Sequence, residues 1–365
     1  MQILFTVTND LTYDQRMTRI CKSLSDAGYK VYLIGVKRKK SIPVIEKGYG
    51  QKRIPVFFES KLWFYIEYNI RLFFFLLFKK ADIICCIDLD TMLPVYFTSI
   101  IRKKIKVYDA HEYFSQQKEI LRRPTIYKVW HFIESHFVPQ FKNGYTVCGS
   151  IASEFLKLYN VDYSIIMNAP LLKPLPQQVG QQERIIIYQG AVNEARGFEF
   201  LIPAMKVINA TLVIYGDGNF MNEVKALIEE NKVQDKVILK GMVPPDELNK
   251  KTSDAYIGVS LVEHFGLNQY YTLGNKFFDY MHHAIPQVTA NIPEYKKIND
   301  EFEIALLIND LSIHSVLKSI NQLLDDEKLH FRLQQNCLKA REVYNWQNEE
   351  KKLISFYNQF DKKTK

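Results

Sequence analysis

The chain has 365 residues, of which 47% are hydrophobic and 24% are charged. This length and apolar content indicate a globular protein with room for two domains of ordinary size. The five cysteines are odd in number and form no CxxC pair, which argues against a disulfide framework or a zinc site and indicates buried thiols in a reducing cytoplasm.

Positive charge is concentrated in the first half of the chain. The net charge is +8, and residues 1–169 carry 25 basic against 15 acidic side chains. The N-terminal run MQILFTVTND passes directly into a strand-like pattern, without the basic and apolar regions of an export signal. We therefore expect a cytoplasmic protein.

The aromatic stretch KLWFYIEYNIRLFFFLLFKK, residues 61–80, follows the basic run KRKK at 37–40. Glu67, Asn69 and Arg71 interrupt it, so it is too polar for a transmembrane helix, which needs about 20 mainly apolar residues. Two interpretations stay open. Basic flanks with Trp and Phe suit a helix that lies on an anionic membrane surface, and the same pattern suits a core helix with solvated lysines at its ends.

Short apolar runs alternate with helical patterns along almost the whole chain. Such runs are typical of strands that are covered on both faces, as in a parallel sheet. Helical patterns separate most of the runs, so the sequence predicts an α/β protein of two Rossmann-like doubly wound domains. The expected strands are 2–8, 30–36, 81–87, 105–110 and 144–149 in the first half, and 184–190, 210–218, 236–241, 255–260, 285–289 and 304–308 in the second.

The run NAPLLKPLPQQVGQQE, residues 168–183, interrupts this pattern with prolines and glutamines. We expect domains at 1–168 and 184–345, a linker at 169–183 and an amphipathic final helix at 346–365. Ligands of open α/β sheets bind beyond the carboxyl ends of the strands, so functional residues should follow the strands and face a cleft between the domains.

The loop after the expected strand 184–190 suits anion binding. Gly190 turns the chain, and Arg196 and Gly197 stand at the start of an amphipathic helix, whose free N–H groups favour a diphosphate. The alternative is an arginine solvated on a surface turn. Gly216 and Gly218 follow the next strand, but the sequence after them departs from the dinucleotide-binding pattern, which argues against an NAD-dependent enzyme.

The stretch YTLGNKFFDYMHHAIP, residues 271–286, places Asn275 and Lys276 in the first turn of a helix, where backbone amides favour an anion. Asp279 follows Asn275 by one turn on the same face, where a carboxylate can accept hydrogen bonds from a vicinal diol such as a ribose. The alternative is a surface ion pair between Lys276 and Asp279, worth a few tenths of a kcal/mol.

Two pairs of polar residues follow strands of the first domain. His111 and Glu112 come after the strand 105–110, where Glu112 could support His111 or act as a base toward an acceptor hydroxyl; the alternative for His111 is a structural role. Asp14 and Arg16 suit acceptor binding as well as capping of the first helix.

The acids of the motif DLD, Asp88 and Asp90, are interpreted as turn acids at a strand end. The histidines lack the spacing of a metal-binding set. We expect neither a metal nor a cofactor.

Together these motifs resemble one known family. The order GAVNEARG, GDG, KGMVPPDEL, SLVEHFGL and NKFFDYMHHAIP, over about residues 184–300, resembles the donor-binding domain of glycosyltransferases of the two-Rossmann B fold, family 4 in particular. NDLTYDQR at 9–16, YDAHEYF at 108–114 and residues 143–170 look like the first domain of these enzymes. The resemblance implies an acceptor-binding first domain, a nucleotide-sugar-binding second domain and a final helix that crosses back to the first.

Site residues carry over position by position. Arg196 takes the place of the family's diphosphate-binding lysine, and Asp279 that of the second glutamate of its Glu, seven residues, Glu motif. The first glutamate is missing, because Tyr271, next to Thr272, stands eight residues before Asp279, whereas Glu263 stands sixteen before it. The resemblance leaves open which of them faces the donor sugar.

Two further roles follow from the resemblance. Ala191 stands where the family often has a basic residue, so Arg196 is expected to work with Lys276. A histidine at the position of His111 contacts the donor sugar in resembling enzymes, where it would orient the sugar or stabilise positive charge.

The resemblance implies transfer of a sugar, with retention and without a metal, from a UDP- or GDP-linked donor to a glycan or polyprenyl-diphosphate-linked acceptor. We expect a role in cell-surface polysaccharide assembly, such as capsule or lipopolysaccharide, at the inner face of the membrane, and no nucleic-acid partner. Two alternatives stay open: a sugar-nucleotide 2-epimerase, and a non-catalytic partner subunit that keeps the fold.

Overall fold

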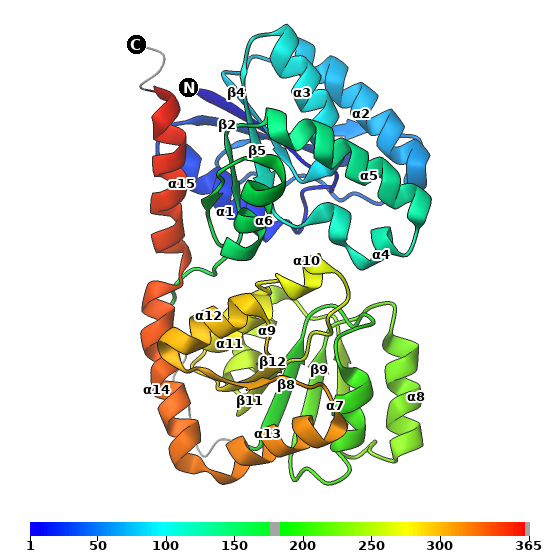
Figure 1. The fold of residues 1–365 in the computed structure, drawn as a ribbon, viewed down its shortest axis with the longest axis vertical. Coiled ribbons are helices and arrows are strands. Elements are labelled where there is room, and N and C mark those ends of the chain that lie inside the picture. The colour runs from blue at the N-terminus through cyan, green and yellow to red at the C-terminus, as the bar shows by residue number, and fades with distance from the viewer. Residues whose placement is uncertain (176–182, 362–365) are drawn as a thin grey trace. The chain divides into compact units, whose positions relative to one another are not determined.

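The computed structural model in Figure 1 describes residues 1–175 and 183–361. It divides into two units: unit 1 comprises residues 1–168 with 349–365, and unit 2 comprises residues 169–348. Residues 176–182, which belong to the expected linker, lie outside the described part. All eleven expected strands are confirmed, with ends that differ by a few residues, and each unit is built on one parallel sheet.

Unit 1 contains a seven-stranded sheet in the order β3-β2-β1-β4-β5-β6-β7. Its central strands are almost wholly buried, as their continuous apolar pattern predicts. The strand order reverses direction between β1 and β4. These two strands pair in parallel, with Ile3 opposite Ile83. The strands are β1 (Gln2–Thr6), β2 (Lys30–Lys37), β3 (Gly50–Pro55), β4 (Ile83–Ile87), β5 (Ile105–Ala110), β6 (Gly144–Thr146) and β7 (Ser164–Ile165).

Strands β3 and β7 are additions to the sequence prediction. The sequence of β3, GQKRIP, is half polar and ends in proline, so it lacks the apolar run of a covered strand. Both strands lie at the edges of the sheet, where polar residues and a proline are tolerated.

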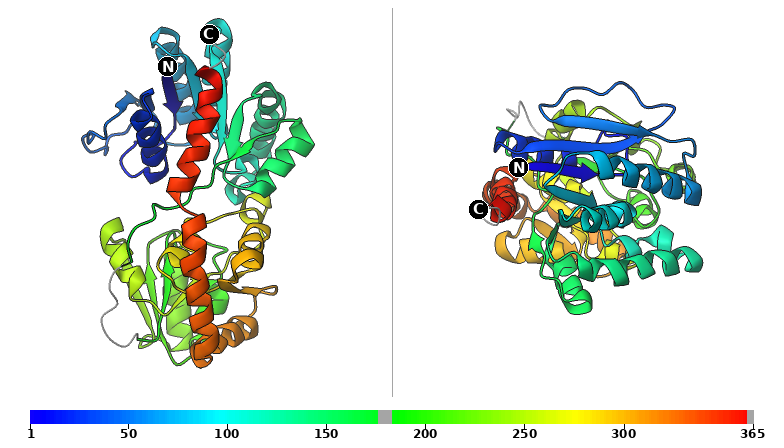
Figure 2. Two further views of the ribbon diagram at one scale, coloured as in Figure 1. Left: turned by 90° about the vertical axis from the view of Figure 1, so that its left-hand side faces the viewer. Right: turned by 90° about the horizontal axis from the view of Figure 1, so that it is seen from above.

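Two helix layers enclose the sheet of unit 1 (Figure 2). Helices α2 (Lys61–Phe78), α3 (Met92–Ile101) and α5 (Pro124–Phe137) lie over one face. Helices α1 (Gln15–Asp26) and α15 (Trp346–Asp361) cover the other, where Tyr357 packs against Phe5 and Tyr145. The remaining helices of this unit are α4 (Lys118–Leu121) and α6 (Gly149–Tyr159).

Unit 2 contains a six-stranded parallel sheet in the order β10-β9-β8-β11-β12-β13, which reverses direction between β8 and β11. The strands are β8 (Ile185–Gln189), β9 (Thr211–Tyr215), β10 (Val237–Gly241), β11 (Ile257–Ser260), β12 (Gln287–Ala290) and β13 (Ala305–Ile308). The helices are α7 (Phe198–Ala204), α8 (Met221–Asn231), α9 (Pro245–Ser253), α10 (Leu267–Tyr270), α11 (Asn275–His282), α12 (Pro293–Phe302), α13 (Ile313–Asp325) and α14 (Glu327–Val343).

The crevice at such a reversal is where open α/β sheets bind ligands, because the loops on its two sides leave in opposite directions. All five cysteines are buried, as the sequence predicts. They therefore serve the packing of the cores.

Candidate active site

Unit 2 has a pocket of about 380 Å³ at the carboxyl ends of β8 and β11. This is the point where the strand order reverses, so the loops that follow both strands contribute to its walls. Six residues predicted from the sequence line the pocket, namely Gly190, Arg196, Thr272, Asn275, Lys276 and Asp279.

Two cationic side chains meet in this pocket. Arg196 lies in the loop after β8, directly before Gly197, whose φ of 73° turns the chain into α7. Lys276 lies in the first turn of α11, as predicted, and its Nζ is 3.8 Å from the centroid of the Tyr188 ring. Burial, and then the charge of Arg196, lower the pKa of Lys276 well below its ordinary value.

The carboxylate of Asp279 is held in place by a glutamine that the sequence analysis missed. Gln189, the last residue of β8, is buried and donates from Nε2 to Asp279 Oδ2 at 2.8 Å. Its Oε1 accepts a hydrogen bond from Thr252 at 2.8 Å. The only signal in the sequence is a polar residue that ends an otherwise apolar strand.

Gly216 and Gly218 support the pocket loop instead of lining the pocket. A Cβ atom at Gly216 would lie 1.9 Å from the carbonyl oxygen of Gly190, and one at Gly218 would lie 2.2 Å from that of Val192. The loop after β9 can therefore pack directly on the loop after β8 only because these residues have no side chain.

Glu263 and Tyr271 both stay outside the set of described residues that line the pocket, whereas their neighbours Val262 and Thr272 belong to it. The N–H of Glu263 donates to the carbonyl of Ala195 at 3.2 Å, so its loop packs against the turn that carries Arg196. The residue that faces a donor sugar thus stays an open question.

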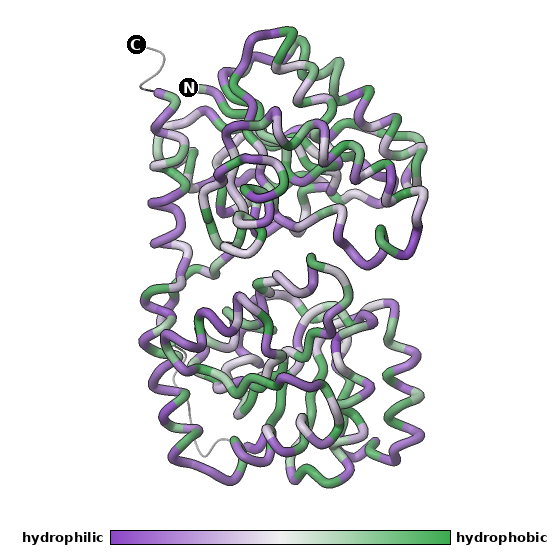
Figure 3. The backbone as a smooth tube through the Cα atoms, viewed as in Figure 1, coloured by the Kyte–Doolittle hydropathy of each residue, from purple (hydrophilic) through white to green (hydrophobic). Residues whose placement is uncertain are grey.

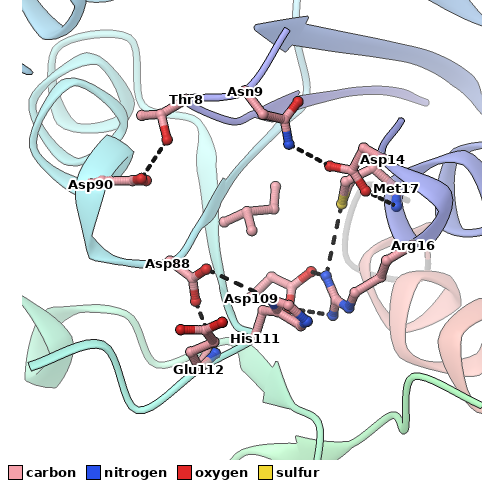
Figure 4. A network of polar contacts seen from close by, with 12 residues as sticks. Thr8, Asn9, Asp14, Arg16, Met17, Asp88, Asp90, Asp109, His111 and Glu112 are labelled. Atoms are coloured by element: carbon pink, nitrogen blue, oxygen red, sulfur yellow. Dashed lines mark hydrogen bonds and ion pairs between the residues drawn. The ribbon is translucent and has the colours of Figure 1, made fainter. Parts of the chain in front are cut away.

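The polar residues predicted in unit 1 form a network at the carboxyl ends of β1, β4 and β5 (Figure 4). Arg16 makes a buried two-pronged ion pair with Asp109 at 2.6 and 2.7 Å. Asp14 caps α1 by accepting from the N–H of Met17 at 2.8 Å, and it accepts from Asn9 at 2.6 Å. The structure therefore gives Asp14 the capping role and places Arg16 in a buried pair instead of an open acceptor site.

Asp88 and Asp90 are more than turn acids, because they form an acidic cluster with Glu112. Asp88 has a φ of 55°, a strained value for a residue with a side chain, and accepts from the N–H of Glu112 at 3.0 Å. Burial, then Glu112 and Asp90, raise the pKa of Asp88 well above its ordinary value. Burial is the main cause that raises the pKa of Asp90 to about 7. The hydrogen bond from Thr8 acts against this increase, and the charge of Glu112 adds to it.

His111 lies beside this cluster, with Nδ1 3.8 Å from Asp88 Oδ2. Burial, and then the charges of Arg16 and Arg19, lower the pKa of His111 to about 3. The imidazole is therefore neutral near pH 7 and acts toward a ligand as a hydrogen-bonding group, without a full positive charge. Within the described residues, no group of three or more His, Cys, Asp or Glu side chains is arranged to hold a metal ion.

Comparison with known proteins gives a match for the second half of the chain. Residues 175–340 match the family model described as glycosyl transferases group 1. The match covers less than half of the chain, and this region is similar to group 1 glycosyl transferases. The more specific assignment to family 4 stays a prediction.

Curated relatives share little sequence identity with this chain. It is 26% identical to an uncharacterized glycosyltransferase of Methanocaldococcus jannaschii over 49% of the chain and 46% of the relative. It is 22% identical to poly(glycerol-phosphate) alpha-glucosyltransferase of Bacillus subtilis over 69% of the chain and 36% of the relative. The matched part thus spans less than half the length of either relative.

Solved structures show the same fold over the whole chain. The chain superposes on sucrose-phosphate synthase from Thermosynechococcus elongatus with a TM-score of 0.83, at 14% identity and 99% coverage of both chains. It superposes on Anabaena HepE in complex with UDP-glucose with a TM-score of 0.76, at 12% identity and coverage of 98% of this chain and 100% of that one. The predicted fold of two Rossmann-like domains, as in B-fold glycosyltransferases, is confirmed.

Proposed function

We propose that this protein transfers a sugar from a nucleoside-diphosphate sugar to a hydroxyl of a glycan or lipid-linked acceptor. The observation that carries the proposal is the meeting of Arg196, Lys276 and the first turn of α11 in one pocket of unit 2. Two cations and a helix N-terminus form a binding site for the diphosphate of the donor.

The chemistry requires such a site, because negative charge develops on the diphosphate as the bond from the anomeric carbon to its oxygen breaks. Fixed cations that face this charge stabilise the transition state, typically by several kcal/mol. Burial and the charge of Arg196 oppose protonation of Lys276, whereas a bound diphosphate would favour it. The attraction between the ammonium group and the diphosphate would then contribute to donor binding.

Asp279 is proposed to bind the ribose of the donor. Its carboxylate lines the same pocket and is oriented by Gln189, so it can accept hydrogen bonds from the two ribose hydroxyls. A structure that shares the fold is a complex with UDP-glucose, which favours UDP as the first nucleotide to test.

The acceptor is proposed to bind to unit 1 beside His111, with Glu112 as the base that takes the proton of the attacking hydroxyl. Retention of anomeric configuration rests on the resemblance to family 4. The name of the relative poly(glycerol-phosphate) alpha-glucosyltransferase supports a polymer as the acceptor. We infer a cytoplasmic enzyme at the inner face of the membrane.

The first prediction tests the donor site. Arg196→Gln and Lys276→Met should each weaken UDP binding about tenfold or more, because each removes a charged partner of the diphosphate. Isothermal titration calorimetry with UDP measures this. Arg184→Gln is the matched control, because Arg184 is exposed and pairs at 3.7 Å with Asp325. Unchanged UDP affinity in both pocket variants would remove the site.

Turnover with a panel of UDP- and GDP-sugars then separates the functions. Transfer or slow hydrolysis of one donor supports the transferase. Release of a free epimer would point to an epimerase, and binding without any turnover to a non-catalytic subunit.

A further inference from the structure

Helix α2 carries two opposite apolar rows. Residues two positions apart lie about 200° apart around a helix, so rows offset by two residues face opposite sides. The inner row is at most 4% exposed and consists of Phe64, Tyr68, Leu72 and Leu76. The outer row is 39% to 86% exposed and consists of Leu62, Ile66, Ile70, Phe74 and Phe78. The inner side of α2 thus fits the interpretation as a core helix, and the outer side fits the interpretation as a helix on a membrane surface.

The neighbouring helices extend the exposed apolar surface. Helix α3 contacts both α2 and α5, so the three form one layer, visible in Figure 1 and coloured by hydropathy in Figure 3. Phe97 and Ile101 of α3 are exposed, as are Val129 and Phe132 of α5. We call the outer row of α2 together with these residues the apolar face.

Three exposed aromatic side chains stand at the N-terminal end of this face. Phe57 is 79% exposed and Trp63 is 63% exposed. Phe58 is also exposed, and the centroid of its ring lies 6.1 Å from that of Trp63. The carboxylate of Glu67 accepts hydrogen bonds from the N–H groups of Phe57 and Phe58 at 2.9 Å. The backbone is therefore fixed where the aromatic rings project into solvent.

The basic run at 37–40 lies next to these aromatic residues. Arg38 donates to the carbonyl of Glu59 at 2.5 Å, and the N–H of Lys39 donates to the carboxylate of Glu59 at 2.6 Å. Lys39 and Lys40 are exposed beside this anchor. The structure thus places exposed lysines close to exposed aromatic rings in unit 1.

We propose that the apolar face of unit 1 docks on the surface of an anionic lipid bilayer. Aromatic and aliphatic side chains would enter the headgroup region, and Lys39 and Lys40 would contact the anionic headgroups. No helix within the described residues is long and apolar enough to cross a bilayer, so the contact is interfacial. The flanking lysines favour anionic lipid over a neutral apolar partner.

The location of this surface fits the proposed function. The role of the surface in acceptor delivery rests on that function. Residues 37–40 follow β2 and residues 56–60 follow β3, so both lie at the carboxyl edge of the sheet. His111 and Glu112 follow β5 at that same edge. A lipid-linked acceptor in the bilayer would therefore present its sugar to the side of unit 1 that carries the proposed base.

The test is co-sedimentation of the whole protein with vesicles of phosphatidylcholine, with and without phosphatidylglycerol. The wild type should bind the anionic vesicles. The double variant Phe57→Ser/Trp63→Ser should bind them at least about tenfold more weakly, because it loses two large apolar side chains that would be buried in the bilayer. Lys39→Glu/Lys40→Glu should remove the preference for anionic lipid. Added salt should weaken wild-type binding.

Phe331→Ser is the matched control, because Phe331 of α14 is 61% exposed and lies in unit 2. It should bind vesicles as the wild type does. Equal partitioning of the wild type and the Phe57/Trp63 variant would overturn the proposal. Variants of the apolar face that change the oligomeric mass of the protein but not its binding to vesicles would also overturn it.

Vesicle binding is measured without any donor, and UDP affinity is measured without vesicles. A failure of membrane docking is thus distinguishable from a failure of the proposed transfer reaction.

Discussion

At the scale of single residues, the pocket of unit 2 contains a glutamine that positions a carboxylate. Gln189 joins Thr252 on one side to Asp279 on the other, with both hydrogen bonds at 2.8 Å. Because Gln189 is buried, loss of its amide would remove two buried hydrogen bonds from the pocket wall.

We predict that Gln189→Leu weakens UDP binding about tenfold, because the Asp279 carboxylate loses its fixed orientation. A double-mutant cycle checks the cause: in an Asp279→Asn background the same substitution should have a smaller effect on UDP affinity. Equal effects in both backgrounds would indicate that Gln189 serves only the packing of the strand.

Asp90 should make stability depend on pH. Its pKa is about 7 in the folded chain against an ordinary 3.8, so between these values the folded state holds a proton that the unfolded state has released. Stability therefore falls as pH rises through this window. Asp90→Asn removes this penalty, and its gain in free energy of unfolding should grow from near zero at about pH 4 to on the order of a few kcal/mol at about pH 8.

Urea unfolding of the wild type and Asp90→Asn across this pH range measures the difference. Asp82→Asn provides a comparison at an exposed carboxylate of the same unit. A gain that is constant with pH would mean that Asp90 ionises at its ordinary pKa.

At the scale of elements, the pocket depends on how closely two strand-end loops approach. Gly216 directly follows β9 with a φ of 138°, and a Cβ there would overlap the Gly190 carbonyl. Gly241, the last residue of β10, has a φ of 65° and nothing within 4 Å of its Cβ position. A substitution at Gly241 therefore tests backbone strain alone, and one at Gly216 tests backbone strain together with direct overlap.

We predict that Gly241→Ala costs about 1 kcal/mol of stability, the usual cost of the left-handed conformation. Gly216→Ala should cost at least about 2 kcal/mol and also weaken UDP binding, because it displaces the loop that carries Gly190. Denaturant unfolding and UDP titration test the pair. Similar costs for both substitutions, with UDP affinity intact, would contradict the packing described for this loop.

At the scale of the whole molecule, the two ends of the chain meet in unit 1. Helix α15 lays Leu353 and Tyr357, both fully buried, against a sheet built from residues more than 180 positions earlier. The Tyr357 ring centroid lies 6.0 Å from that of Phe5 and 6.3 Å from that of Tyr145. Unit 1 therefore cannot complete its core until the last helix has been made.

We predict that Tyr357→Ala destabilises unit 1 by about 3 to 5 kcal/mol, the usual cost of removing a large buried side chain. Ser355→Ala, at an exposed position of the same helix, should change stability by less than about 0.5 kcal/mol. Thermal unfolding with and without UDP distinguishes the units, because UDP should raise only the transition of unit 2. A loss confined to the UDP-sensitive transition would contradict the placement of α15.

The sequence by itself determined the eleven main strands, the two parallel sheets, the loop that holds Arg196 and the helix that holds Lys276 and Asp279. Apolar runs and glycine turns are local patterns, and in a parallel sheet the segments after neighbouring strands necessarily meet at one edge. It also predicted that Asn275 and Lys276 lie in the first turn of α11, because the residues of a first helical turn are neighbours in the chain.

Only the tertiary structure decided which polar residues pair and which apolar residues stay exposed. Arg16 meets Asp109 across 93 residues, Gln189 meets Asp279 across 90, and both rows of α2 are apolar although one is buried and the other is exposed. The pKa values of Asp90 and His111 depend on the same facts. Burial and long-range pairing are properties of packed elements, so they have no signature in a single stretch of sequence.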